Sequence, residues 1–264
     1  MSSILDRFRL DDQVAIVTGS GRGIGAATAV AFADAGADVV VSARTVAQLE
    51  ETAEKVRARG RRALVVACDV LDPDQRKHLV DRAVDEFGRL DILVNNAGGW
   101  PPKPTLQTSE DEFEACFRFN VTTAFAMTRL VVPRIVETAG NGAIVNISSV
   151  AGHFNARGFA AYGTAKSALS FLTRSLAQDF ASKLRVNGIA VGSILTDALA
   201  GFMTEDMERF MLSKTPMARL GRVEDISACA LYLASPASSY VTGEIYGVNS
   251  GLTQIQVDMP PAEI

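Results

Sequence analysis

Short runs rich in β-branched residues alternate with longer stretches of helical character along most of this chain. The first three runs are almost continuously apolar and are predicted as strands at Val14–Thr18, Asp38–Ser42 and Ala63–Ala67. Strands that lack a polar face are buried on both sides of a sheet. Because a helical stretch follows each strand, the pattern favours parallel pairing with helices packed on both faces. This alternation restricts the chain to the α/β class.

The rest of the chain continues the same pattern. Further strands are predicted at Asp91–Val94, Ala143–Ile147, Arg185–Ala190 and Glu244–Val248, and helices near residues 23–35, 46–59, 73–87, after 109, 160–181 and 223–234. No linker or repeat interrupts the 264 residues, a length that suits one large α/β domain. We therefore expect a single domain over residues 1–264, Rossmann-type and doubly wound, with a mostly parallel seven-stranded sheet.

Composition and charge argue against several functional classes. The chain is 48% hydrophobic and 21% charged, as globular proteins are. A net charge of -4 without a basic stripe argues against nucleic acid or an anionic membrane as a partner. Three widely spaced cysteines, Cys68, Cys116 and Cys229, predict neither a disulfide framework nor a metal site. The charged N-terminal segment resembles neither a signal peptide nor an anchor, so we expect a cytoplasmic protein.

A glycine-rich turn follows the first strand. The segment TGSGRGIG occupies residues 18–25 and leads from the first strand into the first helix. Glycine lets the backbone turn sharply and approach a phosphate closely, and a helix N-terminus offers unpaired N–H groups to a pyrophosphate. Because the motif lies between a strand and a helix, it predicts a dinucleotide site. The expected contacts are Gly19, Gly21, Arg22, Gly23, Ile24 and Gly25.

The end of the second strand indicates which dinucleotide is bound. Sites for a free ribose 2′-hydroxyl usually have an acidic residue there, whereas this chain has Ser42-Ala43-Arg44. Arg22 and Arg44 are placed to approach a 2′-phosphate from two sides, which suits the planar, multi-donor guanidinium. The sequence therefore favours NADP(H) over NAD(H). The alternative is that both arginines are merely solvated.

Tyr162 and Lys166 are four residues apart on a predicted helix, so their side chains share a face. A phenol has a pKa of about 10, and a nearby ammonium is expected to lower the pKa of Tyr162. Such a pair can exchange a proton with an alcohol or a ketone near neutral pH. The spacing is common on surface helices, so it is informative only together with other motifs.

Four separated motifs resemble those of the short-chain dehydrogenase/reductase family. They are TGSGRGIG at 18–25, NNAG at 95–98, the serine of ISSV at 147–150, and YGTAK at 162–166. The resemblance covers nearly the whole chain. Within the family, the segments NNAGGWPPKP, VNGIAVGSILTDAL and TPMARLG are similar to bacterial hydroxysteroid dehydrogenases of the 7α type and to related ketone reductases.

The resemblance implies four catalytic residues. Tyr162 would exchange the proton of the substrate oxygen, Ser149 would hold that oxygen, and Lys166 would bind the nicotinamide ribose. Asn120 would hold a water that relays protons to Lys166. Ser148 is the weaker serine candidate, since neighbouring strand residues face opposite ways. For Asn120 the alternative is a buried amide that satisfies local carbonyls.

The same resemblance implies further cofactor contacts, which are Asp69, Val70, Asn95, Ala97, Gly98, the Ile194 backbone and the Thr196 hydroxyl, together with Tyr162 and Lys166. One departure from the family is Val191, which replaces the usual proline. Because proline fixes the backbone angle φ, its absence is expected to loosen this turn.

Substrate specificity is expected to come from a lid at about residues 195–220. Its methionine and phenylalanine side chains, including Met203, are apolar and adaptable. Trp100, His153 and Asn155 lie in loops expected near the same site. These residues favour a hydrophobic ketone or secondary alcohol, including steroid-like ones. Core packing or a subunit contact is the alternative for the apolar residues of the lid.

The sequence therefore predicts an oxidoreductase that transfers a hydride between NADP(H) and a hydrophobic ketone or secondary alcohol. One alternative is a 3-oxoacyl-carrier-protein reductase, for which Arg157, Arg219 and Arg222 are candidates for a basic docking patch. A second, of another class, is a non-catalytic NADP(H)-binding sensor or scaffold. By the family resemblance we also expect a homotetramer in which the long helices at 110–138 and 160–180 pair across subunits.

Overall fold

The computed structural model describes residues 3–196, 199 and 203–256. Its strands are β1 (Val14–Thr18), β2 (Asp38–Ala43), β3 (Ala63–Ala67), β4 (Ile92–Asn95), β5 (Gly142–Ser149), β6 (Leu184–Val191) and β7 (Ile245–Val248). Its α-helices are α1 (Gly23–Asp34), α2 (Val46–Arg57), α3 (Pro73–Phe87), α4 (Glu110–Phe117), α5 (Thr123–Thr138), α6 (Ala160–Phe180), α8 (Glu205–Ser213) and α9 (Val223–Ala234). Short 3-10 turns lie at Ile4–Phe8, Thr105–Gln107, Val150–Gly152 and Pro236–Ser238.

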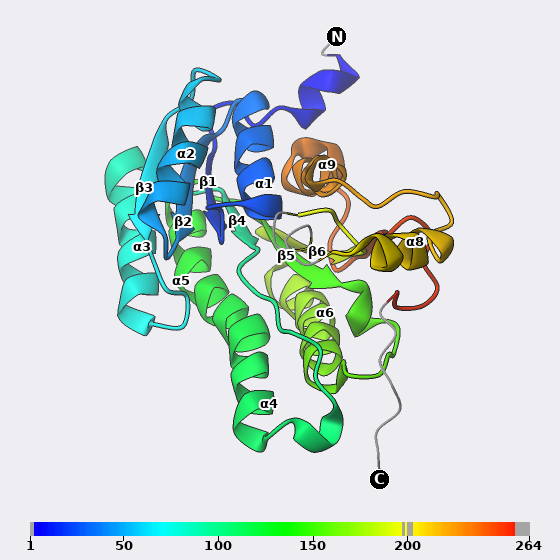
Figure 1. Ribbon diagram of the computed structural model, residues 1–264. Helices are drawn as coiled ribbons and strands as arrows, with labels where there is room; N and C mark the ends of the chain where they lie inside the picture. Colours follow the sequence, from blue (N-terminus) through cyan, green and yellow to red (C-terminus); the bar gives the residue numbers. More distant parts are fainter. Residues whose placement is uncertain (1–2, 197–198, 200–202, 257–264) are drawn as a thin grey trace.

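The strands form one sheet in the order β3-β2-β1-β4-β5-β6-β7, and every neighbouring pair is parallel. The strand order reverses between β1 and β4, and this reversal makes the sheet doubly wound. The expected α/β class, Rossmann-type topology and seven strands are thus confirmed. Because all strands are parallel, their carboxyl ends meet at one edge, and the loops that follow β1, β2, β4, β5 and β6 gather there (Figure 1).

Helices cover both faces of the sheet (Figure 1). On one face, Phe32 of α1, Leu49 of α2 and Leu233 of α9 pack in one apolar cluster with the inner strands. On the other face, helices α3, α5 and α6 contribute to a second cluster, for example through Leu79 and Met127. Strands β1 and β2 are buried between the two clusters, as their sequence predicts. Strand β3 was also expected to be buried on both sides, but it lies at the edge of the sheet and is only partly buried.

Two regions differ from the sequence-based expectations. The long helix after Ser109 is divided by a π-helical turn, η3 (Arg118–Thr122), between α4 and α5. The segment at 195–220 contains a helix, α8, that the sequence analysis did not predict. The two ends of this segment lie side by side, because Leu195 N donates to Gly221 O at 2.8 Å and Gly221 N donates to Ser193 O at 3.0 Å. Among the described residues, no helix is long and apolar enough to cross a membrane.

Candidate active site

The glycine-rich turn is fixed by the neighbouring loop. Gly19 has φ +66° and Gly23 has φ +59°, which is left-handed backbone that favours glycine. The Asn96 amide Nδ2 donates to Thr18 O at 2.9 Å and to Gly19 O at 3.1 Å. A Cβ on Gly25 would lie 2.4 Å from Gly19 O, so α1 can approach the turn only with glycine there. Since no side chain caps α1, its first N–H groups remain available to an anion.

A cavity of about 530 Å³ opens at this edge of the sheet. Its lining includes most of the expected cofactor and catalytic residues: Gly19, Gly21, Arg22, Gly23, Ile24, Arg44, Asp69, Val70, Ala97, Gly98, Ser149, Tyr162, Lys166 and Thr196. It therefore joins the phosphate-binding turn to the Tyr162 pair. This lining fits a dinucleotide. At one end the glycine turn and the free N-terminus of α1 suit the pyrophosphate, and the Tyr162 pair lies at the other end.

Three expected cofactor residues lie outside the lining of this cavity. Gly25 serves close packing beneath the turn. Asn95 was expected beside the cofactor, but its side chain is buried and donates to Asn146 Oδ1 at 2.9 Å. Asn96 is the residue that lines the cavity; neighbouring side chains at a strand end point to opposite sides. The Ile194 side chain lines a separate cavity, which leaves its backbone as the expected contact.

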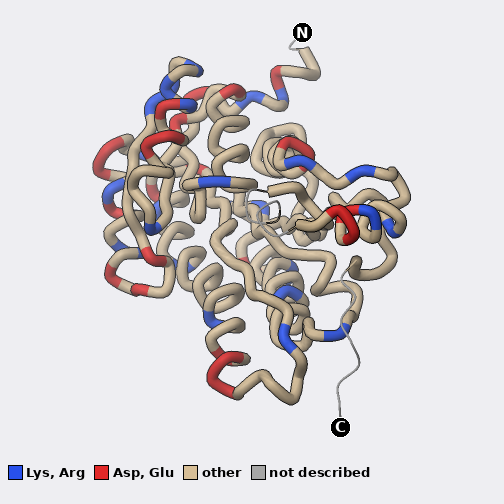
Figure 2. The backbone as a smooth tube through the Cα atoms, viewed as in Figure 1, with Lys and Arg blue, Asp and Glu red and all other residues tan. Residues whose placement is uncertain are grey.

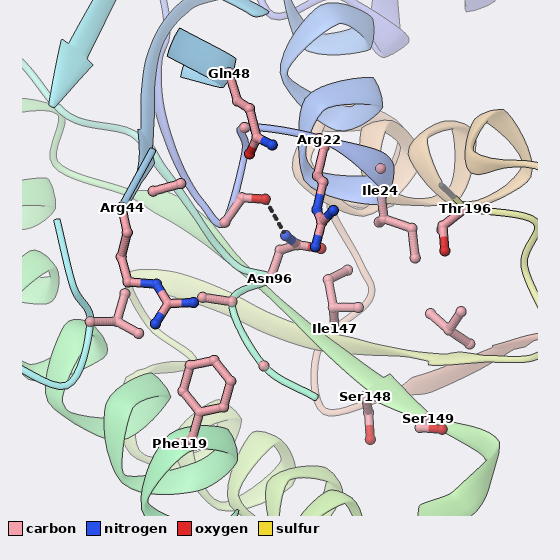
Figure 3. A pocket seen from close by; sticks show the side chains of 18 of the residues that line it. Arg22, Ile24, Arg44, Gln48, Asn96, Phe119, Ile147, Ser148, Ser149 and Thr196 are labelled. Carbon is pink, nitrogen blue, oxygen red and sulfur yellow. Dashed lines mark hydrogen bonds between the residues drawn. The ribbon is translucent and has the colours of Figure 1, made fainter. Parts of the chain in front are cut away.

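The end of β2 carries basic groups and no acid. Arg22 precedes α1 and Arg44 follows β2, and Figure 3 shows both side chains extending toward the middle of the cavity. Neither guanidinium has a hydrogen bond or an ion pair within the described part of the chain. Of the described lining residues, Asp69 is the one carboxylate. This end of the cavity therefore has donors for a phosphate.

Tyr162, Lys166 and Ser149 meet at the other end. The Lys166 ammonium is buried, donates to Ile147 O at 2.9 Å and lies 5.7 Å from the centroid of the Tyr162 ring. The Ser149 side chain hydrogen-bonds the Tyr162 hydroxyl. Helix α6 presents the tyrosine and the lysine one turn apart, and β5 delivers the serine at its carboxyl end.

The expected lowering of the Tyr162 pKa is wrong for this structure. Burial raises the pKa of Tyr162 to about 12, and the hydrogen bond from Ser149 opposes this rise without cancelling it. Burial likewise lowers the pKa of Lys166 to about 8. Loss of water disfavours the charged form of each group, and the ammonium is bonded to a backbone carbonyl instead of the phenol. Tyr162 is therefore protonated at neutral pH in this structure.

Asn120 lies in the π-helical turn behind Gly98. Its Nδ2 donates to Cys116 O at 2.9 Å and to Gly99 O at 3.2 Å, while its Oδ1 accepts from Gly99 N at 2.9 Å. A Cβ on Gly98 would lie 2.8 Å from Asn120 Oδ1 and 3.2 Å from Lys166 Nζ. Asn120 thus satisfies local backbone groups, as the buried-amide alternative expects. It also lies close to Lys166, as the water-holding role requires.

Ser148 hydrogen-bonds residues of α6. Its buried Oγ lies 2.9 Å from Ser170 Oγ and donates to Lys166 O at 3.1 Å. Ser149, which is partly exposed, accepts from Ala151 N at 3.1 Å and keeps its contact with Tyr162. Both serines line the 530 Å³ cavity, but the Ser148 hydroxyl is engaged by α6, whereas Ser149 keeps its contact with Tyr162.

Comparison with known proteins identifies the family. The family model described as enoyl-(acyl carrier protein) reductase matches residues 19–253. The chain belongs to the short-chain dehydrogenase/reductase family. It is 51% identical to an uncharacterized oxidoreductase of Mycobacterium tuberculosis over 97% of this chain and 98% of that protein.

Two further similarities concern one activity. The chain is 41% identical to 7α-hydroxysteroid dehydrogenase of Escherichia coli, over 94% of this chain and 97% of the relative. A solved structure of a 7α-hydroxysteroid dehydrogenase, complexed with NADH and 7-oxo glycochenodeoxycholic acid, superposes with a TM-score of 0.92 at 40% identity, covering 97% of this chain and all of that one. As a short-chain dehydrogenase/reductase, the chain is an oxidoreductase of CH–OH and C=O groups that uses a nicotinamide cofactor.

The expected substrate residues of this short-chain dehydrogenase/reductase do not gather in one place. Trp100 packs with Tyr162 against the cluster around Cys116. His153 and Asn155 line a separate cavity of about 380 Å³, where the His153 ring nitrogen Nε2 lies 3.5 Å from Ser170 Oγ. Met203 is partly buried and lies outside the lining of the 530 Å³ cavity. Residues 197–198 and 200–202 of the expected lid lie outside the described residues.

Several residues that were not expected from the sequence also line the dinucleotide cavity, namely Ala43, Thr45, Gln48, Cys68, Asn96, Phe119, Ile147 and Gly192. Most of them flank predicted contacts, so their position beside the strand ends was the available signal. Gln48 and Phe119 come from helices, and only the packing of α2 and the π-helical turn brings them to the cavity.

Proposed function

We propose that this enzyme interconverts a hydrophobic, steroid-like ketone and its secondary alcohol with NADP(H). The observation that supports this most directly is that Ser149, Tyr162 and Lys166 line the same cavity as the glycine turn. A hydrogen-bonded phenol and hydroxyl at one end of a dinucleotide cavity suit a substrate with a single reacting oxygen.

The preference for NADP(H) rests on Arg22 and Arg44. Both guanidinium groups reach the end of the cavity where the second strand stops, and no described acid at that strand end would repel a 2′-phosphate. The solved relative was complexed with NADH, so the cofactor of that relative does not support this preference. The ratio of kcat/KM for NADPH to that for NADH, measured with one substrate, tests it; a ratio below one would refute it.

The chain's own residues divide the chemistry. A bound nicotinamide supplies or accepts the hydride. Tyr162, protonated at neutral pH, gives its proton to the carbonyl oxygen in reduction and takes it back in oxidation. Ser149 donates a hydrogen bond to the same oxygen as negative charge develops. Lys166 holds the cofactor ribose, and Asn120 fixes the backbone beside it.

Two observations favour a steroid-like ketone over an acyl-carrier substrate. The relatives named 7α-hydroxysteroid dehydrogenase match nearly the whole chain. A basic docking patch for an acidic acyl carrier is weakly supported, because Arg219 is paired with Asp225 at 2.7 Å and Figure 2 shows basic and acidic residues interspersed. A non-catalytic sensor is disfavoured because the hydroxyl pair and the ammonium are brought together. NADPH oxidation with steroid ketones, acyl thioesters and small ketones separates these alternatives.

Replacing Tyr162 with phenylalanine tests the catalytic assignment. Tyr162→Phe removes the proton donor and keeps the ring, so kcat is expected to fall by about 100-fold or more. The Kd for NADPH, measured by fluorescence titration, should stay within about twofold, since the hydroxyl is not a phosphate contact. Tyr240→Phe, at a fully exposed side chain, is the matched control. A variant that keeps a tenth of the wild-type kcat would refute the assignment.

The assembly and location are also part of this proposal. We propose a cytoplasmic homotetramer in which α4, α5 and α6 pair across subunits. Exposed phenylalanines on these helices, Phe113, Phe117, Phe125 and Phe171, support such an interface.

A further inference from the structure

Helix α2 begins with a capping motif that the structure leaves unused. Thr45 is its N-cap residue, and Gln48 stands three residues later, which is the spacing of a capping box. In a capping box the threonine accepts from the backbone of the third helical residue, and the glutamine reaches back to the N-cap N–H. Here the Thr45 side chain caps nothing, and the first turn contains no acidic residue.

The Gln48 side chain lies against the glycine turn instead. A Cβ built on Gly21 would lie 3.1 Å from Gln48 Cβ and 3.2 Å from Gln48 Oε1, so the two segments are in direct contact. Gln48 is partly buried and lines the same cavity as Arg22 and Arg44. Figure 3 shows its amide directed from α2 into the space that the two arginines flank.

Gln48, Arg22 and Arg44 also have unused hydrogen-bond donors. Within the described residues, neither the Gln48 amide nor either guanidinium has a hydrogen-bond partner. The uncapped first turn of α2 adds unpaired backbone N–H groups and positive potential on the same side. A ligand group that accepts several hydrogen bonds and carries negative charge would satisfy all of these donors together.

We propose that Gln48 is a specificity-determining residue that donates its amide N–H to the 2′-phosphate of NADP(H). This inference rests on the proposed NADP(H) preference and adds a residue to it. The amide is neutral and is a donor, whereas a carboxylate at the same atoms would repel the phosphate and would accept from a 2′-hydroxyl. The choice of Gln over Glu at this position therefore contributes to the choice between the two dinucleotides.

The test compares Gln48→Glu and Gln48→Ala with the wild type. For Gln48→Glu the NADPH to NADH ratio of kcat/KM is expected to fall by about tenfold or more, because repulsion replaces a charge-assisted hydrogen bond. Gln48→Ala should lower the ratio by about threefold to tenfold through NADPH alone. Gln107→Glu, an exposed change of the same charge, should leave the ratio unchanged. Glutamate suits the third position of a helix, so Gln48→Glu is expected to fold.

Binding of two probes separates cofactor recognition from catalysis. Adenosine 2′,5′-bisphosphate should lose affinity in Gln48→Glu, while adenosine 5′-monophosphate should keep it, both measured by isothermal titration. If both probes or both cofactors weaken equally, Gln48 only packs against Gly21 and the inference is wrong. If the wild type itself prefers NADH, the proposed NADP(H) preference fails first. If the wild type prefers NADPH and the ratio survives in Gln48→Glu, only the role of Gln48 fails.

Discussion

The burial of Lys166 lowers the stability of the fold. Lys166 is 4% exposed, and the one hydrogen bond described for its ammonium goes to Ile147 O. Its pKa falls from 10.5 to about 8 through burial. A buried cation with a single partner is destabilising, because the protein does not replace its lost hydration. The buried lysine therefore lowers the stability of the fold, a cost that fits the role in the reaction that we propose for it.

A stability measurement can check this interpretation. Lys166→Met keeps the length of the side chain and removes the charge, so the free energy of unfolding at pH 7 is expected to rise by about 1–3 kcal/mol. Chemical denaturation without cofactor measures it. The unfolded chain binds the lysine proton more tightly than the folded one, so wild-type stability rises with pH between about 8 and 10.5. The advantage of the variant should therefore be full below pH 8 and vanish toward pH 10.5. A less stable variant at pH 7 would contradict the argument.

The glycine of the NNAG motif, Gly98, is required because there is no room for a side chain beside Asn120. The sequence marks the glycine of NNAG as a cofactor contact, whereas the structure places it between the Asn120 amide and the Lys166 ammonium. No L side chain fits there without moving one of the two groups. This constraint comes from three segments distant in sequence, so spacing along the chain does not reveal it.

At the scale of elements, hydrogen bonds between Asp225, Arg219 and Arg222 join the end of the α8 segment to the start of α9; we call these three residues the latch. Asp225, in the first turn of α9, accepts from Arg222 N at 2.8 Å and from Arg219 Nη1 and Nη2 at 2.7 and 3.0 Å. These hydrogen bonds, first the one from the Arg219 side chain, lower the pKa of Asp225 to about 2. The latch holds residues 219–225 beside the parallel bridge between Ile194 and Gly221.

Replacing Asp225 with asparagine tests the latch. Asp225→Asn removes the ion pair and weakens the cap, so the free energy of unfolding at pH 7 is expected to fall by about 1 kcal/mol. Because the folded pKa is depressed, this contribution is present above about pH 4 and is lost as pH falls toward 2. Denaturation at pH 7 and pH 3 measures both. Asp206→Asn, at an exposed side chain, is the control. Equal losses at the two pH values would exclude this origin.

The π-helical turn between α4 and α5 is an element that helix propensity cannot predict. It inserts one extra residue into the helical ladder and so turns Asn120 toward Gly99. Such turns often occur at functional sites. The sequence alone indicated one long helix, because the apolar periodicity continues on both sides of the turn.

At the scale of the whole molecule, the exposed aromatic side chains of α4, α5 and α6 bear on assembly. Phe171 is 69% exposed on α6. Phe171→Glu should shift the mass measured by light scattering from a tetramer to a smaller species, because a charge would be desolvated in the interface. Tyr240→Glu, outside these helices, should keep the wild-type mass. A monomeric wild type, or an unchanged Phe171→Glu mass, would refute the proposed interface.

Local sequence patterns were enough to predict the α/β class, the seven strands and the position of the glycine turn. These depend on local properties: which runs are apolar on both faces, and where a backbone without Cβ atoms leads into a helix. Three features required the packed structure: Asn96 and not Asn95 lines the cavity, burial raises the pKa of Tyr162, and the Gln48 side chain lies against Gly21. Each of these depends on which atoms meet across elements distant in sequence, and on how much water remains around them.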